Sequence, residues 1–187
     1  MKAIKSPQPP ASKMTTFLNP EEILNQIDLQ RNMVAADFGS GQGGFAIPLA
    51  RRLESGLVYA LDIQIAPLNA LKSQANFEKI SNIRVIRCDL EKPRGSTLTD
   101  GSLDLVLIVN LLFQSSDKNA IISEAKRVLK KGAKLLVIDW LPNVSVGPSE
   151  GKVSPEEVKK IADNLGLKLE KEIKAGAYHY GLLFNRI

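Results

Sequence analysis

The hydrophobic positions of this chain fall into two alternating kinds of segment. Short apolar runs, typical of buried strands, occupy residues 33–38, 57–62, 83–89, 103–110 and 133–139. Between them, apolar side chains recur at helical spacing over residues 45–53, 67–79 and 119–130, with Gly132 as the expected stop of the last helix. Strands that alternate with helices are joined by right-handed crossovers. The pattern therefore predicts an α/β fold with five parallel strands and helices on both faces of the sheet.

Two short sequences of the same design predict the starts of further helices. Asn19-Pro20-Glu21-Glu22 and Ser154-Pro155-Glu156-Glu157 each place an N-cap residue before Pro and a Glu three positions after the cap. The first is expected to open a short helix with apolar residues at 23, 24 and 27. The second is expected to open a helix that runs to residue 165 and stops at Gly166.

The last part of the chain departs from the alternation. Residues 167–174 and 178–186 both read as strands, and only three residues separate them. A link of this length joins antiparallel neighbours, since parallel strands need a long crossover. We expect an antiparallel hairpin to close the sheet of a single domain over residues 17–187. Residues 1–16, which combine three prolines with lysines, are expected to form a flexible basic arm.

Length, charge and composition narrow the function classes. A chain of 187 residues has room for one domain. Three of its five excess positive charges lie in the arm, so a nucleic-acid partner is conceivable but not favoured. One Cys and one His exclude a disulfide framework and the common zinc sites. With no apolar run of ~20 residues and no secretory signal, we expect a cytoplasmic protein without a membrane span.

A glycine-rich loop, Asp37-Phe38-Gly39-Ser40-Gly41-Gln42-Gly43-Gly44, follows the first strand. Glycines let the backbone turn sharply and approach a ligand, and the next helix points its amide groups into the same space. The loop fits both G-x-G-x-x-G, typical of dinucleotide sites, and D-x-G-x-G-x-G. The carboxylate of Asp37 gives no benefit to a pyrophosphate. It suits S-adenosylmethionine (SAM), which carries an ammonium and a sulfonium instead of a phosphate.

Acidic residues end the second and third strands. Asp62 lies 23 positions after Gly39, where a carboxylate can accept hydrogen bonds from the ribose hydroxyls of either cofactor. Asp89 could receive the exocyclic amine of adenine while Ile63 and Leu90 enclose the ring. The structural alternatives are a helix cap for Asp62 and a surface turn for Asp89.

At this point the chain resembles the class I SAM-dependent methyltransferases. The resemblance rests on five segments: D-F-G-S-G-Q-G-G-F, V-Y-A-L-D-I, R-C-D-L, S-L-D-L-V-L-I-V-N-L-L and E-A-K-R-V-L-K-K-G-A-K-L-L-V-I-D-W. In detail, the chain looks like a small bacterial or archaeal branch near the ubiquinone and menaquinone biosynthesis methyltransferases. The resemblance implies a Rossmann-like sheet of seven strands in the order 3-2-1-4-5-7-6, with strand seven antiparallel. It also implies that SAM is the cofactor. The loop at Phe113-Gln114 departs from many relatives, which place a histidine there.

The resemblance and the strand-end residues together give a set of candidate cofactor contacts. Asp37 would hold the methionine ammonium, Asp62 the ribose and Asp89 the adenine edge, while Asn110 would lie under the methyl donor. The complete set is Asp37, Gly39, Ser40, Gly41, Gly43, Asp62, Ile63, Asp89, Leu90 and Asn110.

Candidates for acceptor chemistry come from topology, because ligands of open α/β sheets bind outside the carboxyl ends of the strands. Asp139 and Trp140 end the fifth strand, and the antiparallel last strand begins at the same edge with Tyr178, His179 and Tyr180. His179, the only imidazole, and Asp139 are the candidate catalytic residues. Their structural alternatives are packing at the edge strand and capping of backbone amides. Trp140, Tyr178 and Tyr180 are candidates for acceptor binding, and residues 141–153 for a lid.

We therefore expect a SAM-dependent methyltransferase that uses in-line displacement on a small, apolar or aromatic acceptor. One alternative is an RNA or protein methyltransferase that uses the arm and the group Arg84, Arg87 and Arg94. Another is an NAD-dependent protein or a nucleotide-binding module without catalysis. No cluster of acids near the fifth strand suggests a metal site, and a homodimer is a plausible way to complete an open site.

Overall fold

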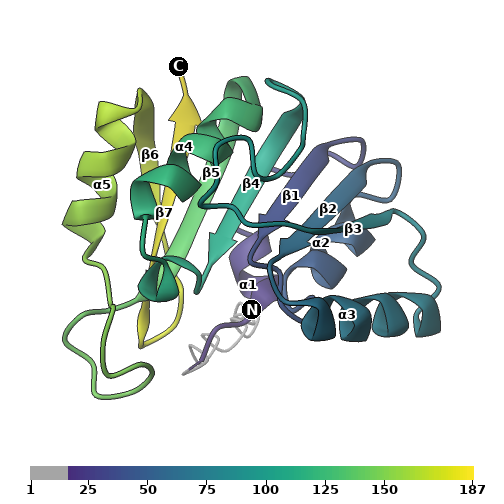
Figure 1. Ribbon diagram of the computed structural model, residues 1–187, viewed down its shortest axis with the longest axis horizontal. Coiled ribbons are helices and arrows are strands. Elements are labelled where there is room, and N and C mark those ends of the chain that lie inside the picture. Colours follow the sequence, from purple (N-terminus) through teal and green to yellow (C-terminus); the bar gives the residue numbers. More distant parts are fainter. Residues whose placement is uncertain (1–16) are drawn as a thin grey trace, which may run out of the picture.

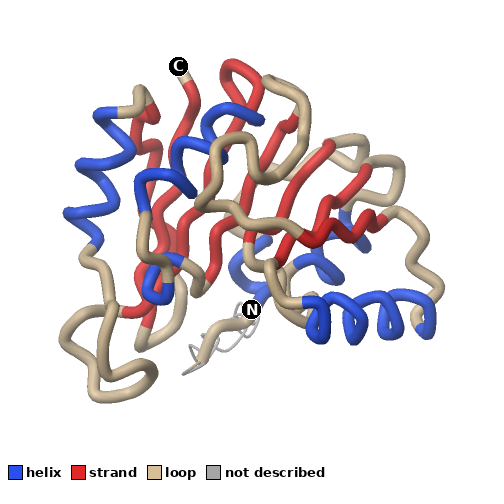
Figure 2. Tube along the Cα trace, in the orientation of Figure 1, coloured by secondary structure: helices blue, strands red, loops and turns tan. Residues whose placement is uncertain are grey.

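In a computed structural model, residues 17–187 of the chain are described. The arm expected over residues 1–16 lies outside the described residues. The chain folds into one seven-stranded sheet between two layers of helices (Figures 1 and 2). The strand order is β3-β2-β1-β4-β5-β7-β6, as the sequence predicts.

Pairing within the sheet is parallel except at β7. The strands are β1 (Val34–Phe38), β2 (Leu57–Asp62), β3 (Ile83–Arg87), β4 (Leu103–Val109), β5 (Leu129–Trp140), β6 (Leu167–Ile173) and β7 (His179–Arg186). β7 runs antiparallel to both of its neighbours, β5 and β6. The predicted hairpin is therefore confirmed, and its β7 strand starts at the edge where β1, β2, β4 and β5 end.

Helices cover both faces of the sheet. They are α1 (Pro20–Leu24), α2 (Ala46–Arg52), α3 (Ile65–Phe77), α4 (Lys118–Val128), α5 (Pro155–Asn164) and the short 3-10 helix η1 (Leu112–Gln114). Buried side chains of α1, α2 and α3 join one apolar cluster, and those of α4 and α5 join the other. The sheet thus has a core on each side, as the alternation of strands and helices predicts.

Both predicted helix starts are confirmed. The Asn19 side chain accepts the backbone N–H groups of Glu21 and Glu22, and Ser154 Oγ accepts that of Glu157 at 3.1 Å. α1 ends at Leu24, yet Ile27 beyond it is also buried. These caps satisfy amide groups that have no partner within the helix.

The boundary between α4 and β5 differs from the prediction. The helix ends at Val128 instead of residue 130, and the strand begins at Leu129, whose backbone is extended and pairs with Leu103. The register then shifts, because the next pair is Leu105 with Lys134. Gly132 (φ +76°) lies inside this irregularity. Its left-handed backbone therefore serves a bend within the strand, not the end of the helix.

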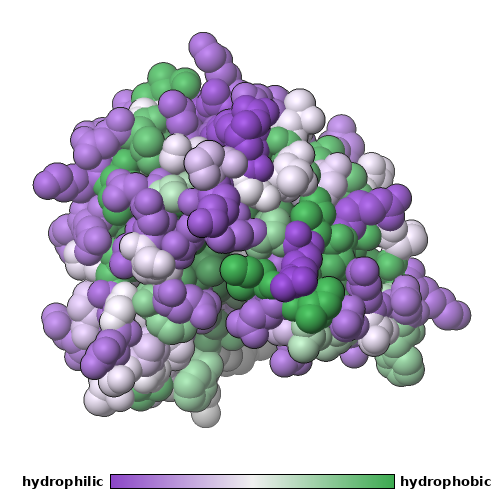
Figure 3. All heavy atoms as spheres, in the orientation of Figure 1, coloured by the Kyte–Doolittle hydropathy of each residue, from purple (hydrophilic) through white to green (hydrophobic). Residues whose placement is uncertain are grey.

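One edge of the sheet gathers the ends of the strands that carry candidate site residues. In Figure 1 this is the lower edge, with α3 at the lower right and the loop 141–153 at the lower left. Figure 3 shows apolar side chains in a hollow between these two parts of the surface. No helix within residues 17–187 is long and apolar enough to cross a membrane.

Candidate active site

The glycine loop after β1 is held by backbone hydrogen bonds to β2. The N–H groups of Gly39 and Ser40 both donate to the carbonyl oxygen of Leu61, at 2.8 and 2.9 Å. Gly39 has φ +73°, and a Cβ there would lie 2.8 Å from Leu111 Cδ1. Gly41 has φ +51° and open space at the same position. Residue 39 must therefore be glycine, both because its backbone is left-handed and because a side chain would clash with Leu111. At residue 41 the loop leaves room for a ligand.

Asp62, at the end of β2, orders the loop from the other side. Its Oδ2 accepts the N–H of Gly41 at 2.9 Å, and its Oδ1 accepts the N–H of Gln64 at 2.9 Å. Each carboxylate oxygen can accept more than one hydrogen bond. Asp62 can thus hold the loop and still accept hydrogen bonds from a hydroxyl-bearing ligand.

A pocket of about 230 Å³ opens beside Asp62. Five of the predicted cofactor residues line it: Gly39, Asp62, Ile63, Asp89 and Leu90. Ile63 is 56% exposed and lines the pocket, so it offers an apolar surface to a flat ligand. Asp89 Oδ1 accepts the N–H of Glu91. No donor to the other carboxylate oxygen is found among residues 17–187. The geometry supports a nucleoside-sized ligand here.

The other residues that line this pocket were not predicted from the sequence. The missed residues are Gln64, Cys88, Glu91, Leu111, Gln114, Ser115 and Ile121, several of them in or beside η1. Ser115 Oγ donates to Glu91 Oε1 at 2.9 Å, which joins the segment after η1 to the segment after β3. Cys88 is partly buried, and burial raises the pKa of its thiol to about 12. It is therefore a neutral wall residue.

Three polar side-chain atoms near the glycine loop have no hydrogen-bond partner among residues 17–187: Asp37 Oδ2, Ser40 Oγ and Asn110 Oδ1. Asp37 is only 2% exposed, and burial raises its pKa to about 7, helped by the charge of Asp62 and opposed by the Ala46 N–H. Asn110 follows β4 with φ +51°, a conformation that is strained for most residues but tolerated by Asn. Buried groups without partners are rare, so these atoms mark a place for a polar ligand.

The other predicted cofactor residues have different positions. Asp37, Ser40, Gly41, Gly43 and Asn110 surround the loop but do not line the 230 Å³ pocket. A Cβ on Gly43 would lie 2.9 Å from Leu71 Cγ and 3.1 Å from Ile47 Cδ1. Gly43 therefore lets α2 and α3 pack closely.

Asp139 is fully buried, and its carboxylate is occupied by backbone amides. Oδ2 accepts the N–H groups of Leu112 (2.9 Å) and Phe113 (3.3 Å), and Oδ1 accepts that of Trp140 (2.8 Å). Burial raises the pKa of Asp139 to about 6, while these amides lower it. The side chain thus joins the end of β5 to η1.

His179 begins β7 opposite Trp140, and the two rings lie 4.0 Å apart between centroids. It is 5% exposed, and neither ring nitrogen has a hydrogen-bond partner in the described part of the chain. Burial lowers the pKa of its imidazole to about 4, so the ring is neutral at physiological pH. The ring of Tyr178 lies against that of Phe17, with centroids 5.5 Å apart and the ring planes tilted by 54°.

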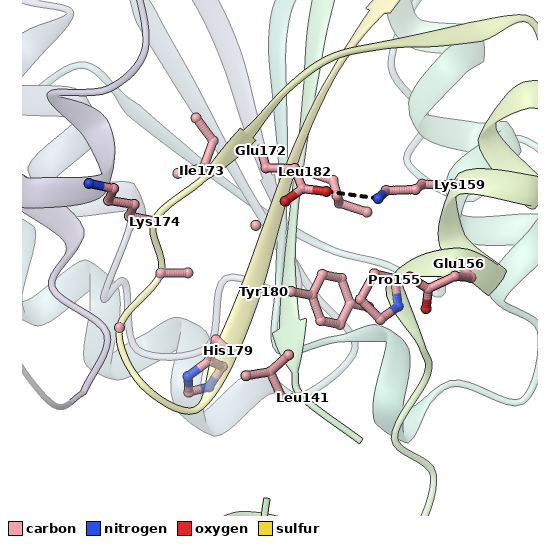
Figure 4. Close-up of a pocket in the computed structure, with 13 residues that line it drawn as sticks. Leu141, Pro155, Glu156, Lys159, Glu172, Ile173, Lys174, His179, Tyr180 and Leu182 are labelled. Atoms are coloured by element: carbon pink, nitrogen blue, oxygen red, sulfur yellow. Dashed lines mark hydrogen bonds and ion pairs between the residues drawn. The ribbon is translucent and has the colours of Figure 1, made fainter. Parts of the chain in front are cut away.

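A second pocket, of about 360 Å³, lies between α5 and the β6–β7 hairpin. Figure 4 shows Tyr180 reaching from β7 towards Pro155, while His179 lies at the start of the same strand and points away from Pro155. Of the predicted acceptor and catalytic residues, His179 and Tyr180 line this pocket, and Asp139, Trp140 and Tyr178 do not. Over residues 17–187 no group of three or more metal-ligating side chains is found.

Sequence comparison identifies the family. The family model for a methyltransferase domain matches residues 29–176, which include every strand from β1 to β6. The chain belongs to this methyltransferase family. The sequence-based prediction of a class I, SAM-dependent methyltransferase is thereby confirmed, and the finer resemblance to quinone-biosynthesis enzymes stays a prediction.

Individual relatives agree with this assignment. A SAM dependent methyltransferase from Aquifex aeolicus has a solved structure with TM-score 0.82 and 27% identity, and 92% of each chain is covered. A norajmaline N-methyltransferase from Rauvolfia serpentina is 28% identical over 143 residues. This match covers 73% of the methyltransferase described here but only 46% of the plant protein.

A more distant structure shares the fold alone. It is a geranyl diphosphate C-methyltransferase from Streptomyces coelicolor A3(2), solved with Mg²⁺, geranyl diphosphate and S-adenosyl-L-homocysteine, with TM-score 0.75 and 14% identity. It covers 90% of this chain and 79% of its own. Together, the family and its relatives support S-adenosylmethionine as the cofactor.

Proposed function

We propose that this methyltransferase moves a methyl group from SAM to a small, apolar or aromatic acceptor by in-line displacement, within one domain over residues 17–187. The observation that carries the proposal is the pocket beside Asp62, where Gly39, Asp62, Asp89 and two apolar side chains meet. When bound, SAM supplies a methyl group made electrophilic by its sulfonium.

The residues around the loop fit this cofactor. Asp37 and Asn110 offer an ammonium group oxygens that have no partner in the described part of the chain, and open space at Gly41 allows close approach of the methionine part. Asp62 accepts hydrogen bonds from the ribose hydroxyls, while Ile63 and Leu90 contact the faces of adenine. No part of this set favours a phosphate, since the acids would repel it.

The protein has two tasks beyond binding. It aligns acceptor, methyl group and sulfur, and such positioning alone can lower a barrier by ~7–11 kcal/mol. It also receives a proton if the acceptor loses one. We assign the proton to His179, because its ring is neutral and its nitrogens have no partner within residues 17–187. Asp139, the other candidate, would position η1 and the end of β5 through its three amide contacts.

The alternative of an RNA or protein acceptor gains little from the structure. It relies on Arg84, Arg87 and Arg94, but Arg87 Nε donates to the Ile63 carbonyl at 3.1 Å and Arg94 forms an ion pair with Asp100 at 2.7 Å. These two guanidinium groups are therefore already engaged. A cytoplasmic location and a homodimer stay predictions from the sequence.

Calorimetric titration with S-adenosylhomocysteine, SAM and NADH tests the cofactor assignment. We expect saturable binding of the first two ligands and none of NADH. Tight NADH binding without S-adenosylhomocysteine binding would contradict the proposal. Incubation of a metabolite extract with methyl-labelled SAM then tests catalysis, since label must appear in a small molecule.

A further inference from the structure

The cofactor pocket is lined by two segments that lie far apart in the sequence. One follows β3 and the other contains η1, and the residues that they contribute are Asp89, Leu90, Glu91, Leu111, Gln114 and Ser115. Every hydrogen bond found between residues 89–95 and 111–117 ends on the carboxylate of Glu91. One side chain therefore joins the two segments.

Both oxygens of Glu91 take part in this link, which we call the Glu91 clasp. Oε1 accepts the Ser115 hydroxyl at 2.9 Å and the Ser116 N–H at 3.0 Å, and Oε2 accepts the Ser116 hydroxyl at 2.9 Å. The Ser115 hydroxyl contributes most to lowering the pKa of Glu91, and desolvation opposes it. The carboxylate is therefore ionised at neutral pH, and an ionised acceptor forms stronger hydrogen bonds than a neutral one.

The backbone of Glu91 also orients Asp89, the residue predicted to contact the adenine edge. The Glu91 N–H donates to Asp89 Oδ1 at 3.0 Å, and no donor to the other oxygen is found among residues 17–187. The turn that follows is tight, because the Lys92 N–H donates to the Asp89 carbonyl and a Cβ on Gly95 would lie 1.9 Å from that carbonyl oxygen. A displacement of Glu91 would therefore also displace the carboxylate of Asp89.

On the other segment, the clasp supports η1. The N–H groups of Leu112 and Phe113 donate to Asp139, so this carboxylate holds the start of η1. The clasp holds residues 115 and 116, directly after its end. Gln114, which lines the pocket, lies between these two anchors. Loss of the clasp would leave η1 with the first anchor alone.

We propose that Glu91 is a positioning residue for the cofactor and that its clasp makes the pocket select adenine over a purine with a 6-oxo group. The carboxylate holds the two pocket segments together, and this arrangement fixes Asp89 opposite the exocyclic amine. The inference rests on the proposed function, because it concerns the adenine end of the same cofactor. It adds to the predicted contacts a residue that acts through Asp89 and η1.

A fixed carboxylate is what separates the two bases. The exocyclic amine of adenine donates to a carboxylate, whereas hypoxanthine presents at the same position a carbonyl oxygen, which only accepts. A carboxylate held in place therefore rejects hypoxanthine, because two acceptors then face each other. A carboxylate that can shift accepts the ring N1–H of hypoxanthine instead, so mobility of Asp89 would lower the preference for adenine.

Calorimetric titration of the full-length protein with S-adenosylhomocysteine and S-inosylhomocysteine tests the proposal. The second ligand carries hypoxanthine in place of adenine and keeps the rest of the molecule. We expect the wild-type protein to prefer S-adenosylhomocysteine by about 30-fold or more. Glu91→Ala should weaken S-adenosylhomocysteine binding about tenfold and reduce the preference to about threefold.

Two further variants separate positioning from charge. Glu91→Gln keeps a carbonyl oxygen for the serines but removes the negative charge, and it should retain affinity and preference within about threefold of the wild type. The double variant Ser115→Ala with Ser116→Ala leaves Glu91 in place and should reduce both quantities as Glu91→Ala does. Combined with Glu91→Ala, it should have little further effect, because both changes remove the same contacts. The double variant also tests the proposal if Glu91→Ala fails to fold.

Glu78→Ala is the matched control. Glu78 accepts the side-chain amide of Gln74 at 2.6 Å and forms an ion pair with Arg51, and it does not line the cofactor pocket. Its replacement removes a comparable set of contacts and should leave both ligand affinities unchanged. Urea denaturation of each variant shows that it is folded under the conditions of the titration.

Three results would overturn the proposal: wild-type affinity in Glu91→Ala, an equal loss of affinity for both ligands, or a Glu91→Gln variant as weak as Glu91→Ala. The second result would reduce the clasp to a support of the fold, and the third would assign the effect to charge. If S-adenosylhomocysteine binds the wild-type protein in any of these cases, the role of Glu91 alone fails. If it does not bind the wild-type protein, the cofactor assignment fails as well.

Discussion

At the glycine loop, three consecutive backbone N–H groups donate to β2 while side-chain oxygens of Asp37 and Ser40 have no partner among residues 17–187, whereas aromatic rings pack against one another at the β5–β7 end of the same edge. Gly39, Ser40 and Gly41 all donate their N–H groups to β2, while Asp37 keeps an oxygen without a described partner. At the other end, the ring of Trp140 lies at a tilt against His179, and that of Phe17 at a tilt against Tyr178. The first region thus leaves polar side-chain atoms open to a ligand, whereas the second is closed mainly by contacts between rings.

The strongest test of this contrast is a pair of alanine substitutions in the loop. Gly39→Ala should lower the free energy of unfolding by about 3 kcal/mol, because it adds left-handed strain and a contact with Leu111. Gly41→Ala meets open space and should cost only about 1 kcal/mol. Urea denaturation measures both values. Equal losses would show that the Leu111 contact does not fix the loop, and Leu111→Ala should relieve part of the Gly39→Ala effect.

Removing the carboxylate that serves both loop and ligand should affect binding most. Asp62→Ala is expected to weaken S-adenosylhomocysteine binding about 100-fold, since two charge-assisted hydrogen bonds and the anchor of Gly41 are lost. Asp163→Ala, an exposed acid on α5, is the matched control and should leave the affinity unchanged. Calorimetry gives both numbers. If the affinity of the Asp62→Ala variant for S-adenosylhomocysteine falls by less than about threefold, the ribose does not bind at Asp62.

The two ends should also respond differently to pH. Because the pKa of Asp37 is raised to about 7, its carboxyl is mostly neutral below that pH and binds an ammonium poorly. S-adenosylhomocysteine affinity should therefore rise about tenfold from about pH 6 to about pH 8. The imidazole of His179, with its pKa lowered to about 4, should not titrate in this range.

Asp37→Asn is the control for this pH effect and should flatten the affinity profile. In the absence of ligand, the contribution of Asp37 to the free energy of unfolding changes with pH in the opposite direction. A carboxyl whose pKa is raised in the folded state binds protons more readily there than when unfolded, so its contribution to stability decreases between about pH 4 and about pH 7. An affinity that falls with rising pH would contradict the role of Asp37.

The smallest expected effect concerns a contact that supports the β6–β7 hairpin. The Gln26 amide donates to the carbonyl of Lys174 and accepts its N–H, both at 2.9 Å. Gln26→Ala should lower the free energy of unfolding by about 1 kcal/mol, because two hydrogen bonds to the end of β6 are lost. Gln30→Ala removes a side chain that donates only to nearby Asp28 and is the comparison. Identical denaturation curves for the two variants would mean that the hairpin needs no such support.

Sequence predicted the sheet completely and the site in part, for reasons that particular residues illustrate. Alternation and link length, which are local, predict parallel strands closed by a hairpin, whereas the strand order came from the resemblance to the methyltransferase family. Leu111, Gln114 and Ser115 could not be found, because their position in the cofactor pocket depends on how η1 folds back over the sheet. The end of α4 was misplaced since Leu129 pairs with Leu103, a long-range contact that overrides helical spacing.

The two acids at strand ends show the same limit. Sequence left Asp139 open as either a base or a cap of backbone amides, and the choice depends on N–H groups of η1 that lie 26 or more positions away. For Asp37 the spacing gave its place beside the glycines, but the unpartnered oxygen became visible only with the packing of α2.

The contacts of Asp139 have a thermodynamic consequence. This one carboxylate holds η1, which forms part of the cofactor pocket wall, and the residue whose ring lies on His179. Were a ligand to shift η1, the shift would reach Trp140 through this carboxylate, and binding at the two ends of the edge would then be coupled. Such cooperativity is reciprocal: if cofactor strengthens acceptor binding by some factor, acceptor must strengthen cofactor binding by the same factor.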